Sequence, residues 1–210
     1  KKLGFSTAFS VGNEANVDIV DCMEHLAVCP HTKVICLYIE AIRRGRRFVD
    51  AARSIVPHKP IVAYYVGGSE SGKRASMSHT GAVSGPDDIY DGVFRQSGII
   101  RAQSIEEMFD ICAILGASPL PAGNRVVIQT HSGGPGAVAA DACHREGLKI
   151  PPLPHHLREM LAEFIPLTGS LNNPLDITFS KDQLDYFFKI PSRLIADNTY
   201  DILLLYLLLP

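Results

Sequence analysis

The sequence lacks an excess of charge of either sign. Its 20 lysines and arginines are balanced by 22 aspartates and glutamates, which gives a formal net charge of −2. A nucleic-acid partner usually requires a basic surface for its phosphates and aromatic platforms for its bases. Because no basic run is interleaved with aromatic residues in this way, we expect no nucleic-acid partner.

The cysteines show no ligand spacing. The five cysteines form an odd number without a C-x-x-C pair, and most lie in apolar segments. This pattern is typical of free thiols in a reducing cytoplasm and not of a disulfide framework. Cys29-Pro-His31 alone does not make a zinc site. We therefore expect a cytoplasmic protein without a metal site.

Long apolar runs are also missing. The longest, residues 202–210, is far shorter than the roughly 20 residues that a membrane-spanning helix needs. No apolar signal core follows Lys1-Lys2, so we expect no membrane segment. The terminal run has no turn, cap or helix after it, and we expect the chain to be a piece of a longer protein.

The sequence does contain a regular alternation of short aliphatic runs with longer helix-like stretches. Such alternation is typical of βαβ units, which build a parallel sheet covered by helices on both faces. In the first half the predicted strands are 3–9, 33–39, 60–66 and 99–102, and the predicted helices are 17–26, 44–55, 87–96 and 105–115.

A Pro/Gly/Ser-rich stretch at 116–124 has the composition of a linker, and the alternation restarts after it. There the predicted strands are 125–130 and 202–209, and the predicted helices are 136–145, 154–164 and 181–194. We therefore predict an α/β fold with two flavodoxin-like (Rossmann-like) domains, residues 1–118 and 119–210, each with a mainly parallel sheet. Ligands of such sheets collect at the carboxyl ends of the strands.

The loop after the third predicted strand, residues 67–85, is long, rich in glycine and serine, and contains a single histidine, His79. A loop of this length inside a compact domain is usually either functional or disordered. Gly81 beside the histidine would let the backbone approach a ligand closely. The residues alone leave two interpretations open, a reactive histidine or a solvated histidine on a flexible surface loop.

Two glycine turns resemble each other. Ser10-Val-Gly-Asn13 and Ser132-Gly-Gly-Pro-Gly136 each stand between a predicted strand and a predicted helix. Small residues expose backbone amides there, and the helix dipole adds partial positive charge, so both turns are candidate phosphate sites. Glycine-rich turns of this kind also occur without any ligand.

Two further residues stand at predicted strand ends. Glu40 closes the second strand and could accept a hydrogen bond from an imidazole, or could simply be a solvated acid. His131 lies in Thr130-His-Ser-Gly-Gly134, where a serine-hydrolase elbow would need glycine in place of Thr130. We therefore expect no serine hydrolase, and we interpret His131 as a strand-end residue.

Several motifs together resemble a known family. Ser78-His-Thr-Gly-Ala-Val-Ser-Gly85 is similar to the phosphohistidine motif of ADP-forming acetyl-CoA synthetases and to the histidine loop of succinyl-CoA synthetase α subunits. Further matches follow in the family's order over nearly the whole chain: Ser10-Val-Gly-Asn13, Gly45-Arg-Arg-Phe48, Phe94-Arg-Gln-Ser-Gly98, Ser132-Gly-Gly-Pro-Gly136 and Asn173-Pro-Leu-Asp-Ile-Thr178. The chain thus resembles the two central CoA-ligase domains of an NDP-forming acyl-CoA synthetase, with the second domain truncated.

The resemblance implies a reaction and a set of site residues. The reaction is acyl-CoA + phosphate + ADP ⇌ carboxylic acid + CoA + ATP, through an acyl phosphate and a phosphorylated histidine. His79 corresponds to the phosphate carrier, and Glu40 to the carboxylate that orients its imidazole. The residues expected to contact phosphate are Gly12, Asn13, Ser78, Thr80, Gly81, Ser132, Gly133, Gly134 and Gly136.

The resemblance also implies substrates and partners. CoA, ATP or ADP and phosphate are substrates and not tightly bound cofactors, and Mg²⁺ belongs to an ATP-grasp module. That module and a CoA-binding domain are expected on the same or another chain, in an oligomer. Where the family commonly has Lys and Gly-Arg-Ser, this chain has Tyr65-Val-Gly-Gly-Ser69, so that a cationic contribution is missing there.

Two other classes of function stay open. The first is a non-catalytic regulatory or scaffold module, as in protein acyltransferases that carry a synthetase-like region. Such relatives often lack the histidine, whereas His79 and Glu40 are both present here. The second is a simple nucleotide-binding module, which ranks last because the second domain lacks a Walker lysine motif and the first lacks G-x-G-x-x-G.

Overall fold

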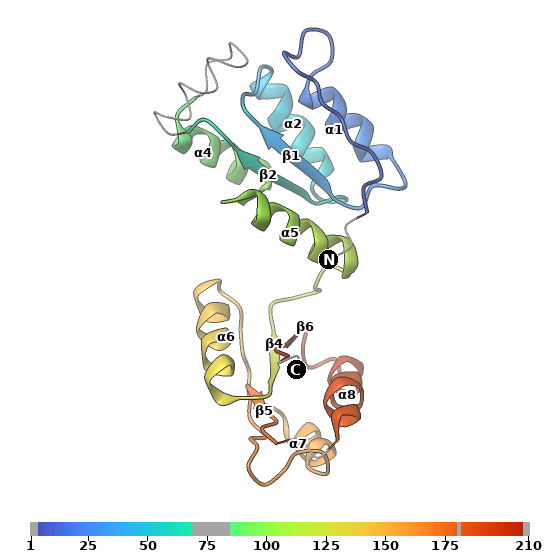
Figure 1. Ribbon diagram of the computed structural model, residues 1–210, viewed down its shortest axis with the longest axis vertical. Helices are drawn as coiled ribbons and strands as arrows, with labels where there is room; N and C mark the ends of the chain where they lie inside the picture. The colour runs from blue at the N-terminus through green and yellow to red at the C-terminus, as the bar shows by residue number, and fades with distance from the viewer. Residues whose placement is uncertain (1–3, 69–84, 180–181, 208–210) are drawn as a thin grey trace. The chain divides into compact units, whose positions relative to one another are not determined.

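The computed structural model of the chain describes residues 4–68, 85–179 and 182–207. The chain divides into two compact units, Lys1–Leu120 and Pro121–Pro210 (Figure 1), whereas the boundary expected from the linker composition lies between residues 118 and 119. Each unit contains a three-stranded sheet of parallel strands with helices packed against it. The predicted α/β fold class is therefore confirmed.

Unit 1 is built around a sheet with the strand order β1-β2-β3. Its elements in chain order are α1 (Ile19–Val28), β1 (Ile35–Ile39), α2 (Gly45–Ile55), β2 (Ile61–Tyr65), α4 (Asp87–Ser97), β3 (Ile100–Ala102) and α5 (Ile105–Ala117). Each strand run is mostly β-branched or aliphatic, as expected for strands that helices cover on both faces.

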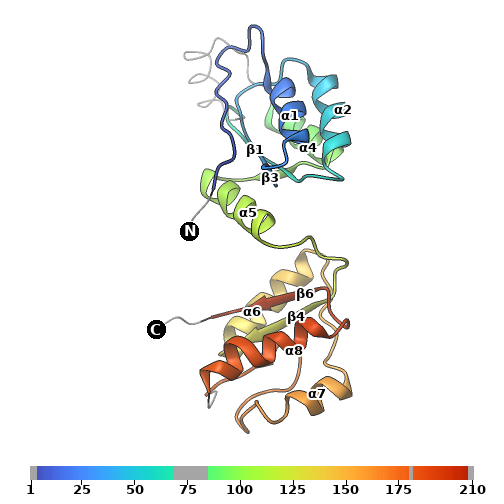
Figure 2. The same cartoon turned by 90° about the vertical axis from the view of Figure 1, so that its right-hand side faces the viewer.

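The side chains of β1 alternate between two layers of helices. Ile35, Leu37 and Ile39 are buried with residues of α1, α2 and α4, including the fully buried Phe48. On the other face, α5 packs through Met108 against β2 and β3. Figures 1 and 2 show α5 on one side of this sheet and α1 and α2 on the other.

The expected first strand at 3–9 is wrong over its described part. Residues 4–9 form no strand, and their side chains are exposed, including Phe5 and Phe9. The segment holds few large apolar residues, separated by Ser6, Thr7 and Ala8, and it pairs with no strand of the described sheet. Without a partner strand or a buried face, an extended run has neither the hydrogen bonds nor the packing that would stabilise it as a strand.

Unit 2 has the strand order β5-β4-β6. Its elements in chain order are β4 (Val126–Thr130), α6 (Gly133–Arg145), α7 (His155–Leu161), β5 (Leu175–Asp176), the π-helix η1 (Asp185–Lys189), α8 (Ile190–Ala196) and β6 (Ile202–Leu205). The helix expected at 154–164 ends early, at Leu161. In the described part of the helix expected at 181–194, helical residues begin at 183, and the π-helical stretch η1 precedes Pro191, which has no amide to donate.

The core of unit 2 also lies on both faces of its sheet. Val126 and Ile128 pack with Cys143 of α6 on one face. Val127 and Leu175 pack on the other face with α7, η1 and α8. β5 was not expected, and its two residues pair with Gln129 and Thr130 at the carboxyl end of β4. This pairing brings Asp176 beside the glycine turn that follows β4.

Candidate functional site

The carboxyl edge of the first sheet positions Glu40. β1 ends at Ile39, which pairs with Tyr65 at the end of β2, and the amide of Val66 donates to the carbonyl of Ile39 at 2.9 Å. Glu40 follows directly and is partly buried. No hydrogen bond or ion pair links its carboxylate to another residue in the described part of the chain, so that the carboxylate has acceptor capacity left for a further group.

Ser78, His79, Thr80 and Gly81 lie outside the described residues. Both flanks of their segment are described and lie at the same sheet edge. Gly68 packs against the side chain of Asp87 at the start of α4, so closely that a Cβ at this position would clash with it. Gly68, the last described residue before the segment, thus lies at the sheet edge that carries Glu40.

The returning flank is fixed to the same edge. The hydroxyl of Tyr65, the last residue of β2, donates to the carbonyl of Gly85 at 2.8 Å. The ring of Tyr65 stacks on Tyr90 of α4, with centroids 3.6 Å apart and an interplanar angle of 10°. Tyr65 therefore anchors Gly85, although it stands where a cationic residue was expected from the family pattern.

A cationic side chain does reach this edge, but from the next strand. Arg101 of β3 lines a cavity of about 260 Å³ with Gly67 and Gly68. Its guanidinium pairs with Asp87 at 2.5 Å and with Asp91 at 3.5 Å, and its Nε is buried without a hydrogen-bond partner in the described part. Sequence reasoning missed Arg101, because one basic residue in a three-residue strand has no distinguishing pattern.

The first glycine turn does not open onto a helix. Among the described residues no strand precedes Gly12 and Asn13, both of which are exposed, and α1 begins only at Ile19. Gly12 has a φ of +55°, which accounts for glycine there. The expectation of a strand-to-helix turn at this position is thus wrong, because the helix start is determined by a capping residue further along the chain.

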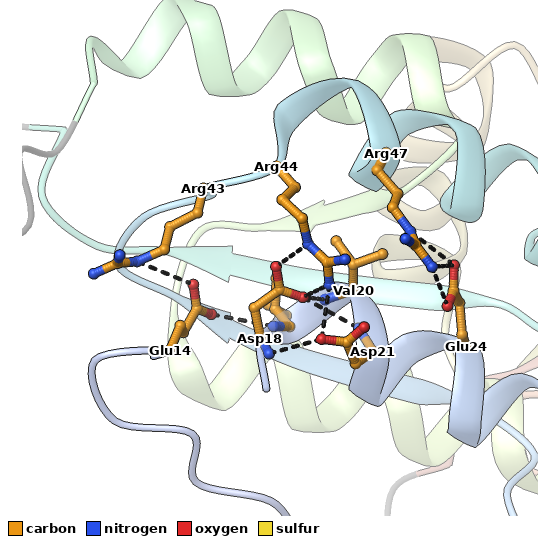
Figure 3. Close-up of polar contacts among 9 residues, drawn as sticks. Glu14, Asp18, Val20, Asp21, Glu24, Arg43, Arg44 and Arg47 are labelled. Atoms are coloured by element: carbon orange, nitrogen blue, oxygen red, sulfur yellow. Dashed lines mark hydrogen bonds and ion pairs between the residues drawn. The ribbon is translucent and has the colours of Figure 1, made fainter. Parts of the chain in front are cut away.

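That capping residue is Asp18, and carboxylates already occupy the first turn of α1. Asp18 Oδ1 accepts hydrogen bonds from the amides of Val20 and Asp21 at 2.8 and 3.2 Å, and Glu14 Oε1 accepts from the amide of Ile19 at 3.2 Å (Figure 3). These bonds satisfy the amides that an anion at a helix N-terminus would use. In this structure the α1 terminus is therefore closed to phosphate.

Arg44 stabilises the charge of this cap. Its guanidinium binds the Asp18 carboxylate through two nitrogens and also contacts Asp21 at 2.7 Å (Figure 3). The hydrogen bonds from Arg44, with those from the amides of Asp21 and Val20, lower the pKa of Asp18 to about 2. Asp18 is consequently ionised at neutral pH although its side chain is buried.

The second glycine turn does lead from a strand into a helix. Ser132 is the N-cap of α6 and makes no side-chain cap bond, and Gly133 and Gly134 are exposed in the first turn. Gly136, in contrast, is buried, and a Cβ there would approach Thr130 Cγ2 to 3.0 Å and Pro174 Cβ to 3.2 Å. Glycine at 136 therefore has a packing role.

Asp176 and Thr178 join this turn and were not assigned from the sequence. Asp176 Oδ1 accepts from the amide of Thr178 at 3.0 Å and lies 2.6 Å from its hydroxyl. A Cβ on Gly133 would lie 3.3 Å from Asp176 Oδ2, which places this carboxylate beside the start of α6. The Asn173–Thr178 motif was the available signal, but the two-residue strand that positions it has no periodicity.

His131 follows β4 directly and is held by packing. Its ring stacks on Tyr186 with centroids 3.5 Å apart and an interplanar angle of 10°, and its Nδ1 is buried without a partner among the described residues. Burial lowers the pKa of His131, which favours the neutral ring at pH 7.

Neither a metal cluster nor a membrane span is found in the ranges that the structure describes. No group of three or more His, Cys, Asp or Glu side chains there could hold a metal ion. None of the helices is both long and apolar enough to cross a bilayer.

Comparison with known proteins identifies both units. Residues 1–115 match the model of the succinyl-CoA ligase-like flavodoxin domain, and residues 126–206 match that of the ligase-CoA domain. The α subunit of acetate–CoA ligase (ADP-forming) II from Pyrococcus furiosus is 41% identical over 99% of this chain and 45% of its own length. The 4-hydroxybutyrate–CoA ligase (ADP-forming) from Nitrosopumilus maritimus is 37% identical over 86% of this chain and 26% of its own length.

A solved structure has the same arrangement of elements. It is the acetyl-coenzyme A synthetase 1 of Ca. Korarchaeum cryptofilum in complex with phosphate and ADP, with a TM-score of 0.85 and 36% identity over 93% of this chain and 42% of the other. The chain spans less than half the length of these relatives. The resemblance inferred from the histidine motif is confirmed, and the chain belongs to the succinyl-CoA ligase-like flavodoxin family, as a relative of the ADP-forming acyl-CoA ligases.

Proposed function

We propose that the chain is part of an ADP-forming acyl-CoA ligase and relays phosphate through His79. In the direction of ATP synthesis, acyl-CoA and phosphate give an acyl phosphate and CoA. The phosphoryl group then passes from the acyl phosphate to His79, and the carboxylic acid is released. In the last step the phosphoryl group passes from His79 to ADP, which becomes ATP. A covalent carrier of this kind divides a transfer between two sites into two simpler steps.

One observation carries this proposal: Glu40 and both flanks of the histidine segment lie at a single sheet edge. Val66, two residues before Gly68, binds the carbonyl of Ile39, which directly precedes Glu40. On the returning side Tyr65 binds Gly85. A free carboxylate at the sheet edge where both described flanks of that segment lie supports the role of Glu40 as the group that orients the imidazole.

The chemistry requires a neutral imidazole with one lone pair directed at phosphorus. When Glu40 accepts a hydrogen bond from one ring nitrogen, the other nitrogen is left as the nucleophile. Ser78, Thr80 and Gly81 are proposed to hold the phosphoryl group around His79. Their hydroxyl groups and backbone amides can donate hydrogen bonds to the negatively charged phosphoryl oxygens.

The helix ends contribute unequally in this proposal. Gly133 and Gly134 in the first turn of α6 are exposed and open, and with Ser132 they are proposed to receive the phosphate. The first turn of α1 is already bound by carboxylates, so that Gly12 and Asn13 would contact phosphate only through their own turn. A helix N-terminus contributes about 0.3–1 kcal/mol toward an anion, and up to ~2 kcal/mol when partly buried.

The remaining assignments belong to the complete enzyme. Residues 1–118 are proposed as the histidine-bearing domain, and 119–210 as part of the second CoA-ligase domain. CoA, ATP or ADP and phosphate are the proposed substrates. ATP-grasp and CoA-binding domains on the same or another chain would supply the Mg²⁺-nucleotide and CoA sites, in an oligomeric enzyme of the cytoplasm.

An isotope-exchange experiment tests the relay without acid or CoA. The complete enzyme is incubated with ATP and labelled ADP, and the appearance of label in ATP is followed. This exchange requires only that His79 accept a phosphoryl group from ATP and return it to ADP. The wild type should exchange, His79→Ala should not, and His58→Ala, which removes an exposed histidine after α2, should exchange normally. Exchange by His79→Ala at the wild-type rate would refute the relay, and no exchange by the wild type would favour a regulatory module.

A further inference from the structure

The loop that follows β1 carries Glu40 and is held in place by residues of other elements. The amide of Ile42 donates to the hydroxyl oxygen of Tyr90 on α4 at 3.2 Å. At the end of the loop, Arg44 binds Asp18 and Asp21 at the start of α1 (Figure 3). Glu40 thus belongs to a loop with two fixed points, and its own carboxylate takes no part in fixing it.

Tyr90 also contacts the returning flank of the histidine segment. Its ring stacks on Tyr65, whose hydroxyl binds the carbonyl of Gly85. A Cβ on Gly85 would lie 3.0 Å from Tyr90 Cε2, so that this glycine rests directly against the ring. Tyr90 is therefore in contact both with the loop of Glu40 and with the residue at which the histidine segment re-enters the fold.

The surroundings of Tyr90 fix its ring and keep its hydroxyl protonated. The side chain is 8% exposed and packs edge-to-face on Phe94, with centroids 6.1 Å apart. Burial raises the pKa of Tyr90, so that the hydroxyl stays neutral at physiological pH. An aromatic side chain with this packing has few alternative positions, and its oxygen is a rigid reference point for the amide of Ile42.

We infer that Tyr90 is a positioning residue for the phosphate relay: its hydroxyl fixes the loop of Glu40, while its ring supports the flank of the histidine segment at Gly85. This inference rests on the proposed role of Glu40 and adds a residue to it. Tyr90 is not proposed to contact the phosphoryl group. It acts by keeping the orienting carboxylate in register with the segment that carries the nucleophile.

A double-mutant cycle in the complete enzyme tests the inference. Tyr90→Phe, Glu40→Gln and the double variant are compared for kcat and KM in acyl-CoA formation. Tyr90→Phe keeps the stacked ring and removes only the hydroxyl. It should lower kcat by about 10-fold, since small displacements of a catalytic group cost up to ~100-fold, and it should leave KM for ATP within about twofold. The double variant should be no slower than Glu40→Gln alone, because both changes act on the same orientation.

Ser97→Ala is the matched control. Ser97 lies on the same helix, is 2% exposed and donates its hydroxyl to the carbonyl of Val93 at 2.6 Å. Its loss removes one buried hydrogen bond of α4 without touching the loop of Glu40. Ser97→Ala should reduce thermal stability as much as Tyr90→Phe does, yet leave kcat unchanged.

The possible outcomes separate the inference from the function on which it rests. If Glu40→Gln leaves kcat unchanged, the proposed function of Glu40 fails and the inference fails with it. If Glu40→Gln lowers kcat but Tyr90→Phe behaves like Ser97→Ala, only the inference is overturned. It is overturned as well if the effects of Tyr90→Phe and Glu40→Gln multiply in the double variant, because the two residues then act independently.

Discussion

Arg44 lies across the N-terminus of α1 and binds Asp18, the residue whose carboxylate caps that helix (Figure 3). The pair joins the loop after β1 to the first turn of α1. It has two consequences: the helix terminus is filled by a carboxylate of the protein itself, and the loop that carries Glu40 is fixed at one end.

Two substitutions of Asp18 should separate the contribution of the helix cap to stability from that of the ion pair. Asp18→Ala removes both and should lower the free energy of unfolding by about 1–3 kcal/mol, since a helix cap alone contributes about 0.5–2 kcal/mol. Asp18→Asn keeps a good capping side chain and loses only the charge, so its cost should be smaller. Urea unfolding followed by circular dichroism measures both variants, and equal losses would show that the cap contributes nothing.

Acid should weaken unit 1 through the same residue. The pKa of Asp18 is about 2 in the folded chain, against an ordinary value of 3.8. Because the folded value is the lower one, the stabilisation by Asp18 is complete above about pH 4 and is lost as the pH falls through about 2. The difference in unfolding free energy between wild type and Asp18→Asn should shrink over this window. A difference that is constant from pH 6 to pH 2 would contradict the ion pair.

Two glycines of the second turn should respond differently to the same change. Gly136→Ala places a methyl group against Thr130 and Pro174 and should cost about 1–3 kcal/mol of stability through overpacking. Gly134→Ala meets no described atom within 4 Å and should leave stability nearly unchanged. Under the proposed function, however, Gly134→Ala should slow phosphorylation, because it crowds the open end of α6. Thermal unfolding and a phosphorylation assay on both variants separate packing from ligand contact.

Asn173 holds the segment that delivers Asp176. Its side-chain amide donates to the carbonyls of Val126 and Pro151 at 2.8 and 2.9 Å, and its oxygen accepts from the amide of Ile128 at 3.0 Å. Asn173→Ala removes three hydrogen bonds and leaves their backbone partners without them, so it should destabilise unit 2 by about 2–4 kcal/mol. The exposed neighbour Asn172 is the control, and Asn172→Ala should cost less than about 0.5 kcal/mol. Equal stability losses in the two variants would contradict this role of Asn173.

The sequence was most informative where the local pattern and the tertiary packing agree. The runs at 33–39 and 60–66 are almost continuously aliphatic or aromatic, and β1 and β2 form there as buried parallel strands. The run at 3–9 holds fewer large apolar residues, and it finds no partner in the described sheet. Pairing is a non-local property that a short run cannot reveal.

Parts of the candidate site were hidden for the same reason. Arg101 and Tyr90 come to the edge of Glu40 only because β3 and α4 pack beside β2, and neither stands in a distinctive motif. The start of α1 was, in contrast, readable: Asp18 with an acid three residues later, Asp21, is a capping-box pattern. The start of the helix was instead assigned to the glycine turn at Gly12.

Mapping the phosphorylated residue tests the relay through His79 without relying on turnover. The complete enzyme is incubated with ATP, and the phosphopeptide is located by mass spectrometry while phosphorus NMR identifies the bond. We expect an acid-labile, base-stable phosphate on His79 in the wild type, less of it in Glu40→Gln, and none in His79→Ala. Wild-type labelling of His79→Ala, or a phosphate on His131 or on a serine, would contradict it.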